Sequence, residues 1–183
     1  MLRSFVLVFI MMLPIGQAQA RDHDETWIMV DTQSQALMVM QGNKVVEIFA
    51  GISVGYGGTA ELHFQGDGRT PKGSFHVAWV NPDSRFHLFF GLDYPNLDQA
   101  ERAYHDGIID FDAYYEIRKA LHQGKLPPQD TALGGHIGIH GLGSKDPKVH
   151  KMLNWTEGCV ALTDEQVDQL ARWVEVGTRV VII

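Results

Sequence analysis

A chain of 183 residues with 45% hydrophobic content is long enough to bury one substantial core. Its 15 basic and 22 acidic residues give a formal net charge of −7 at pH 7, with the histidines neutral. This acidic balance argues against binding to nucleic acid or to anionic lipid, because both need a basic protein surface.

The first twenty residues have the pattern of an export signal. Arg3 supplies a positive charge, an apolar run extends from Phe5 to Ile15, and residues 18–20 (Ala-Gln-Ala) form a small-x-small cleavage site. An apolar run of this length is too short to span a bilayer, which takes roughly 20 residues. We therefore predict that 1–20 is a cleaved signal peptide and that 21–183 is one exported, periplasmic domain without stable membrane insertion. An uncleaved anchor is the alternative.

Strand patterns occupy the first part of the predicted mature chain. Apolar runs at 27–32, 36–40 and 45–50 predict paired strands, and Gln-Gly-Asn-Lys at 41–44 predicts a hairpin turn. Residues 51–58 are rich in glycine but lack the strand-GxGxxG-helix order of a nucleotide site, which favours a turn or a strand edge. Residues 69–73 (Arg-Thr-Pro-Lys-Gly) predict a tight turn before a strand at 74–80.

Helical periodicity appears in two later stretches. Residues 97–124 predict a helical insertion of two helices, the second with Asp112 as its N-cap and Gly124 at its end. Thr163 and Gln166 resemble a capping box that opens a last helix, which we expect to end at Gly177. A final strand follows at 179–183. The predicted fold class is mainly β with helical insertions.

The single cysteine, Cys159, lies nineteen positions after His140. In an exported chain a lone cysteine is a reactive thiol, half of an intermolecular disulfide, or a buried and inert side chain. A cysteine with a histidine elsewhere in the chain is a candidate nucleophile and general base. We therefore predict catalytic roles for Cys159 and His140.

The glycine-rich stretch 134–141 is a poor helix former, since each glycine costs about 1 kcal/mol there. As a strand it would place His136, Gly138 and His140 on one face. The two histidines would then lie roughly 13 Å apart, too far to share one zinc ion. We predict no metal site and no cofactor.

The residues around Cys159 suggest how a reacting carbonyl would be held. Gly158 lets backbone approach a substrate closely, so the N–H groups of Gly158 and Cys159 are candidate oxyanion donors, with the Thr156 hydroxyl as a third. The carbonyl of Gly141 is a candidate group for orienting the His140 ring.

Ile-His-Gly at 139–141 and Thr-x-Gly-Cys-Val-Ala-Leu at 156–162 resemble the signature of the L,D-transpeptidase (YkuD-type) catalytic domain family. The chain is similar to the branch with Trp-Thr-x-Gly-Cys-x-Ala-Leu, and the likeness extends over nearly all of 21–183. The resemblance implies a β-sandwich-like domain with Cys159 as nucleophile and His140 as base. The chain departs from the family pattern at two positions. Glu157 stands where many members have histidine, and Ala161 stands where many have arginine or asparagine.

The resemblance also implies a substrate and a biological setting. Family members form a thioester after meso-diaminopimelate in peptidoglycan stem peptides, release D-alanine, and pass the acyl group to an amine or to water. This implies a role in cell-wall organisation and cell shape, and covalent reaction with carbapenem-type inhibitors. Arg69, Lys72 and Arg85 are candidates for the substrate carboxylate. Alternatives are a carboxypeptidase, an amidase that releases a wall-linked protein, and a wall-binding module with an inert cysteine.

Overall fold

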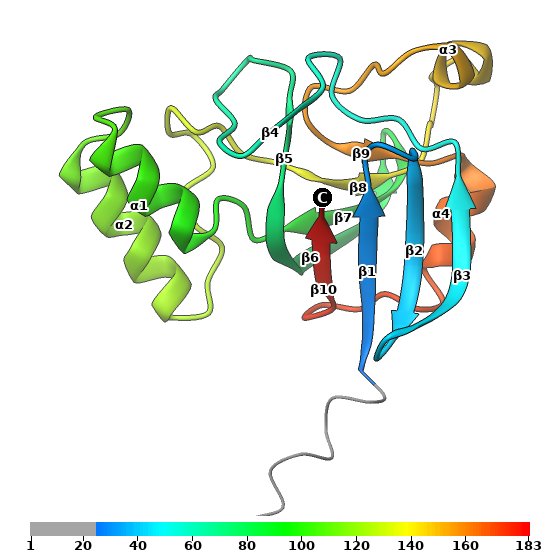
Figure 1. The fold of residues 1–183 in the computed structure, drawn as a ribbon, viewed down its shortest axis with the longest axis horizontal. Coiled ribbons are helices and arrows are strands. Elements are labelled where there is room, and N and C mark those ends of the chain that lie inside the picture. The colour runs from blue at the N-terminus through cyan, green and yellow to red at the C-terminus, as the bar shows by residue number, and fades with distance from the viewer. Residues whose placement is uncertain (1–24) are drawn as a thin grey trace, which may run out of the picture.

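The computed structural model describes residues 25–183, so the predicted signal peptide lies outside the described residues. This part of the chain forms ten strands and four helices (Figure 1). The strands are β1 (Thr26–Asp31), β2 (Ala36–Gln41), β3 (Lys44–Ala50), β4 (Thr59–Ala60), β5 (Thr70–Pro71), β6 (Gly73–Ser84), β7 (His87–Leu92), β8 (Gly138–His140), β9 (Val160–Ala161) and β10 (Arg179–Ile182). The helices are α1 (Leu97–His105), α2 (Phe111–His122), α3 (Pro147–Met152) and α4 (Asp164–Leu170).

Eight strands form one mixed sheet in the order β3-β2-β1-β10-β6-β7-β8-β9. The hairpin predicted at 41–44 is confirmed, because β2 and β3 pair antiparallel with Gln41 opposite Lys44. The final strand is confirmed as well: β10 lies between β1, to which it is parallel, and β6, to which it is antiparallel. The first and the last strand of the described chain are therefore neighbours in the interior of the sheet.

The long strand β6 turns the sheet into a two-layered structure. Its first residues, 73–76, pair with β10, whereas 77–84 pair with β7 across two register shifts. The edge strands of the sheet are β3 and β9. Ser53, which follows β3, exchanges two backbone hydrogen bonds with Ala161 of β9, at 2.9 and 2.7 Å. Because Ser53 follows the edge strand β3, these bonds join one edge of the sheet to the other. The predicted mainly β, sandwich-like architecture is confirmed.

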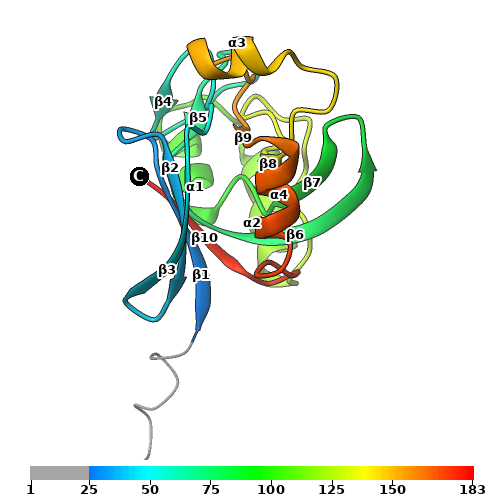
Figure 2. The same ribbon diagram turned by 90° about the vertical axis from the view of Figure 1, so that its right-hand side faces the viewer.

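Alternating side chains of the strands fill the space between the layers. Ile28 and Val30 of β1, and Leu37 and Val39 of β2, are fully buried, as expected for every second residue of a strand. Helix α4 contacts β7 and β8, and Figure 2 shows it beside these strands. Its buried residues, Val167 and Leu170, belong to the same hydrophobic cluster as the strand residues. This packing fixes the strand that carries His140.

The two helices predicted within 97–124 are present, but one cap is wrong. Helix α2 begins after Asp110, whose side chain accepts a hydrogen bond from the Ala113 N–H at 2.8 Å, so Asp112 lies in the first helical turn. The cap is therefore the aspartate two positions before the predicted one. Figure 1 shows α1 and α2 packed together to one side of the sheet.

The last helix is shorter than predicted. The capping box of Thr163 and Gln166 is confirmed, with reciprocal hydrogen bonds of 3.2 and 3.0 Å. The helix nevertheless ends at Leu170, because the N–H groups of Arg172 and Trp173 bond three residues back rather than four. Val174 remains buried beyond the helix end, which explains why its apolar spacing resembled a helical stripe.

No helix within residues 25–183 combines the length and the apolar character needed to cross a membrane.

Candidate active site

The strand that carries His140 is shorter than predicted. Strand β8 contains only Gly138–His140, and His136 lies outside it with a φ of 56°. The N–H of His136 donates to the Gln129 side chain at 2.7 Å, which holds the backbone in this left-handed conformation. The predicted alternation of His136, Gly138 and His140 on one strand face is therefore wrong.

The His140 ring is enclosed by aromatic side chains and is 1% exposed. Phe86 stacks on it with centroids 4.2 Å apart, Phe89 lies parallel at 5.7 Å, and Trp155 approaches edge-on at 5.8 Å. Burial in this setting lowers the pKa of His140 to about 4, against a weaker opposing effect from the Gly141 carbonyl. The ring is neutral at pH 7.

A hydrogen bond fixes the tautomer of that neutral ring. His140 Nδ1 lies 2.7 Å from the carbonyl oxygen of Gly141, and because a carbonyl only accepts, Nδ1 carries the proton. Nε2 is therefore the proton acceptor. The following turn is held in place by Asp164, whose carboxylate accepts the N–H groups of Leu142 at 2.6 Å and Gly143 at 3.0 Å.

Parallel pairing brings the cysteine beside this strand. Ile139 of β8 pairs with Val160 of β9, so the register places Cys159 beside Gly138. Cys159 is half-buried, and its Sγ donates to the carbonyl of His136 at 3.4 Å. Burial raises the pKa of the Cys159 thiol to about 12, and a backbone hydrogen bond from Gly138 partly offsets this. The resting site therefore holds a neutral thiol, bonded to the His136 carbonyl, and a neutral imidazole.

The loop that precedes the cysteine is closed by the Thr156 side chain. Its hydroxyl donates to the Cys159 carbonyl at 2.6 Å and accepts from the Gly158 N–H at 3.3 Å. Both the hydroxyl proton and the Gly158 amide are thus engaged within the loop. Among residues 25–183, the Cys159 N–H has no hydrogen-bond acceptor, so it is the candidate oxyanion donor that is free in this structure.

Cys159 and His140 line one cavity of about 810 Å³. Arg85 lines it too, and its guanidinium carbon lies 4.7 Å above the Phe86 ring. Lys72 instead lines a separate pocket beside α1. The other lining residues are His63, Gln65, Gly66, Trp79, Asn81, Asp83, Ser84, Phe86, Phe89, Gln129, Gly134, Gly135, His136, Ile137, Trp155, Thr156 and Glu157. Neither Arg69 nor any residue of α1 or α2 is among them.

Sequence reasoning overlooked part of this site. Neither Phe86 nor Phe89 was singled out from the sequence, and neither was His63. Asp164 was placed in the last helix with no role toward the His140 turn. Within 25–183, no cluster of three or more His, Cys, Asp or Glu residues is arranged to hold a metal ion.

Comparison with known proteins identifies the fold and the family. Residues 25–182 match the L,D-transpeptidase catalytic domain (YkuD). No curated protein sequence matches. Among solved structures, the chain is similar to Bd1075 of Bdellovibrio bacteriovorus (TM-score 0.57, 16% identity, 90% of this chain and 50% of that chain). It is also similar to Pgp2, the helical cell shape determining protein of Campylobacter jejuni (0.55, 20%, 88% and 50%).

A third similar structure is the catalytic domain of the E. faecium L,D-transpeptidase (TM-score 0.51, 16% identity, 87% of this chain and 98% of that chain). The chain spans about half the length of the first two structures and nearly all of the third. At these sequence identities, the likeness to the solved structures shows only a shared fold. The match to the family extends over almost every described residue. The chain belongs to the L,D-transpeptidase (YkuD-type) catalytic domain family.

Proposed function

We propose that this chain is an exported cysteine L,D-transpeptidase that acts on peptidoglycan stem peptides, with Cys159 as nucleophile and His140 as general base. One observation carries the proposal. Cys159 and His140 line the same cavity, and the Gly141 carbonyl occupies Nδ1 of His140, so that Nε2 is the nitrogen that accepts a proton. The family match supports the reaction class.

The first half-reaction forms a thioester. As Sγ of Cys159 attacks the carbonyl carbon after meso-diaminopimelate, His140 takes the thiol proton. The C–N bond then breaks, and His140 passes that proton to the departing amine of D-alanine. The neutral resting pair favours proton transfer during the attack over a preformed thiolate, because burial disfavours both charged forms.

The negative oxygen of the tetrahedral intermediate needs hydrogen-bond donors. The free N–H of Cys159 is the first donor. The Gly158 N–H is the second, and to serve it must give up its 3.3 Å bond to Thr156. The Thr156 hydroxyl acts indirectly, since its 2.6 Å bond to the Cys159 carbonyl holds the backbone that presents these amides.

Arg85 is the basic residue that we propose for the substrate carboxylate. It is exposed, it lines the cavity, and within 25–183 it forms no ion pair with an acidic side chain. A guanidinium binds a carboxylate through paired N–H groups. Neither Lys72 nor Arg69 lines the cavity.

Incubation of the purified mature protein with a tetrapeptide stem, followed by mass spectrometry, tests the proposal. The expected products are a thioester adduct on Cys159, free D-alanine and a cross-linked dimer. Cys159→Ala should form no adduct. Tripeptide without dimer would indicate the hydrolytic alternative, in which water replaces the acceptor amine. Absence of any adduct, with the stem or with a carbapenem, would favour a wall-binding module and overturn the proposal.

A further inference from the structure

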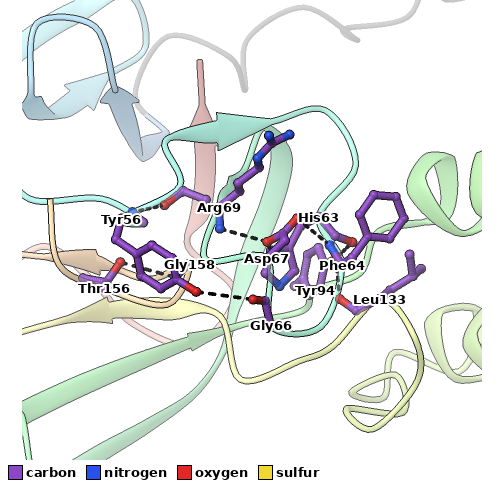
Figure 3. A network of polar contacts seen from close by, with 12 residues as sticks. Tyr56, His63, Phe64, Gly66, Asp67, Arg69, Tyr94, Leu133, Thr156 and Gly158 are labelled. Atoms are coloured by element: carbon purple, nitrogen blue, oxygen red, sulfur yellow. Dashed lines mark hydrogen bonds and ion pairs between the residues drawn. The ribbon is translucent and has the colours of Figure 1, made fainter.

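A second histidine lines the catalytic cavity. His63 lies in the loop between β4 and β5 and is 2% exposed, nearly as buried as His140. Its ring meets Tyr94 edge-on with centroids 5.6 Å apart, and the Tyr94 hydroxyl donates to the carbonyls of His63 at 3.2 Å and Leu133 at 2.8 Å (Figure 3). Both the ring and the backbone of His63 are therefore held in place.

A carboxylate lies against the His63 ring. Nδ1 of His63 lies 2.7 Å from Oδ1 of Asp67, an ion-pair contact without the geometry of a hydrogen bond. Asp67 is itself fixed, because its oxygens accept the N–H groups of Phe64 at 2.9 Å and Arg69 at 2.8 Å. A carboxylate beside Nδ1 favours the tautomer with the proton on that nitrogen, which leaves Nε2 as the acceptor.

The ring also adjoins both segments that carry the reacting groups. A methyl group placed on Gly158 would lie 3.4 Å from Cε1 of His63, and one placed on Gly134 would lie 3.3 Å from Nε2. Gly158 directly precedes the nucleophile. Gly134 begins the stretch that leads through His136 to His140. His63 thus lies where these two backbones meet at the cavity wall.

We propose that His63, oriented by Asp67, is a second general base of this site, which deprotonates the acceptor in the second half-reaction. The inference rests on the proposed transpeptidase function and divides its proton transfers between two histidines. His140 serves formation of the thioester, and His63 serves its transfer to the acceptor. Asp67 is a positioning residue that acts through His63.

The proposed step balances as follows. The acceptor is an amine or a water molecule, and its nitrogen or oxygen attacks the thioester carbonyl carbon while Nε2 of His63 takes one proton from it. The tetrahedral intermediate collapses, the C–S bond breaks and Cys159 leaves as a thiolate. The proton on His63 then returns through solvent to the thiolate, which restores the thiol and both neutral imidazoles.

The charge environment of His63 suits this task. Burial lowers its pKa, and Asp67 opposes that effect, so the ring is neutral at pH 7 and able to accept a proton. As positive charge develops on the ring, the adjacent carboxylate stabilises it. The Gly141 carbonyl offers His140 only a dipole for the same purpose.

Separate measurement of the two half-reactions tests the proposal. Mature wild type, His63→Gln and Asp67→Asn are mixed with the tetrapeptide stem, and intact mass is followed over time. We expect His63→Gln to form the thioester within about threefold of the wild-type rate and then to accumulate it. Its steady-state turnover should fall about 100-fold or more, the usual range for loss of a general base. Asp67→Asn should show the same pattern to a lesser degree.

Tyr94→Phe is the matched control, because it removes an anchor of the His63 backbone and keeps the imidazole. It should show the wild-type ratio of thioester formation to transfer. A parallel fall of both half-reactions in His63→Gln and Asp67→Asn would indicate a purely structural role and overturn the proposal, as would unchanged turnover. A wild-type protein that forms no thioester would overturn the proposed function itself, which is a distinguishable result.

Discussion

Replacement of His140 by glutamine should abolish a specific part of the acid sensitivity of the fold. His140 is 1% exposed, and burial lowers its pKa to about 4 from the ordinary value of 6.5. Between these two pH values the unfolded chain binds a proton at this position and the folded chain does not, so stability rises with pH across that window. The contribution of the neutral His140 ring to the free energy of unfolding is fully present above pH 6.5. It falls as the pH drops below 6.5 and is lost once the pH has fallen through about 4.

The magnitude follows from the difference between the two pKa values. Each tenfold change in proton affinity corresponds to 1.36 kcal/mol, so a pKa of 6.5 lowered to about 4 represents about 3 kcal/mol. The other histidines with lowered pKa, His63 and His150, remain in both proteins and cancel in the comparison. The same holds for His87, whose pKa is raised.

Urea unfolding of wild type and His140→Gln at several pH values from 7.5 to 4 provides the assay. The wild-type free energy of unfolding, minus that of the variant, should shrink by about 3 kcal/mol over this range. A difference that stays constant with pH would refute the reasoning, because it would mean that the ring protonates as readily in the folded chain as in the unfolded one. Arg85→Gln should raise the lower end of this window and so reduce the change in stability, since the Arg85 charge also lowers the pKa of His140 in the folded chain.

Three further changes probe the cavity and its walls. Arg85→Gln should raise KM for the stem peptide about tenfold, as expected when a charge-assisted hydrogen bond is lost, whereas Lys72→Gln, outside the cavity, should leave KM unchanged in the same steady-state assay. Thr156→Val should cost 1–3 kcal/mol in urea unfolding and slow thioester formation, and Thr156→Ser should retain both. Gly138→Ala should lower stability by about 1–3 kcal/mol, because the added methyl would lie 2.5 Å from the Phe89 ring.

The sequence was most informative where a local pattern has a single physical solution. The two-residue turn at Gly42-Asn43 and the capping box at Thr163 depend only on neighbouring residues, and both occur as predicted. The N-cap predicted at Asp112 was wrong because Asp110, an equally good capping residue, begins the helix two positions earlier. Helix α3 was overlooked because six residues are too few for helical periodicity, although Asp146-Pro147 is a typical helix start.

In the candidate site too, local motifs indicated some residues, whereas contacts between distant segments could not be predicted. Cys159, His140 and the Gly141 carbonyl were all proposed from motifs. The parallel pairing of β8 with β9 brings together His140 at the end of β8, Gly141 just after it and Cys159 just before β9. Their catalytic roles stay predictions. The environment of the His140 ring was not predictable, since Phe86 reaches it from a turn more than fifty residues earlier and nothing in the local sequence specifies that contact.

His63 illustrates why such contacts escape sequence reasoning and why they matter for mechanism. It is separated from Cys159 by 96 positions, and only the folded loop between β4 and β5 brings it to the glycine before the nucleophile. After His140 has protonated the leaving amine it is neutral again, so both imidazoles are in the form that accepts a proton when the acceptor arrives. The two buried rings differ in the partner of Nδ1, a neutral carbonyl for His140 and a carboxylate for His63, and only the carboxylate can offset the positive charge that develops on its ring.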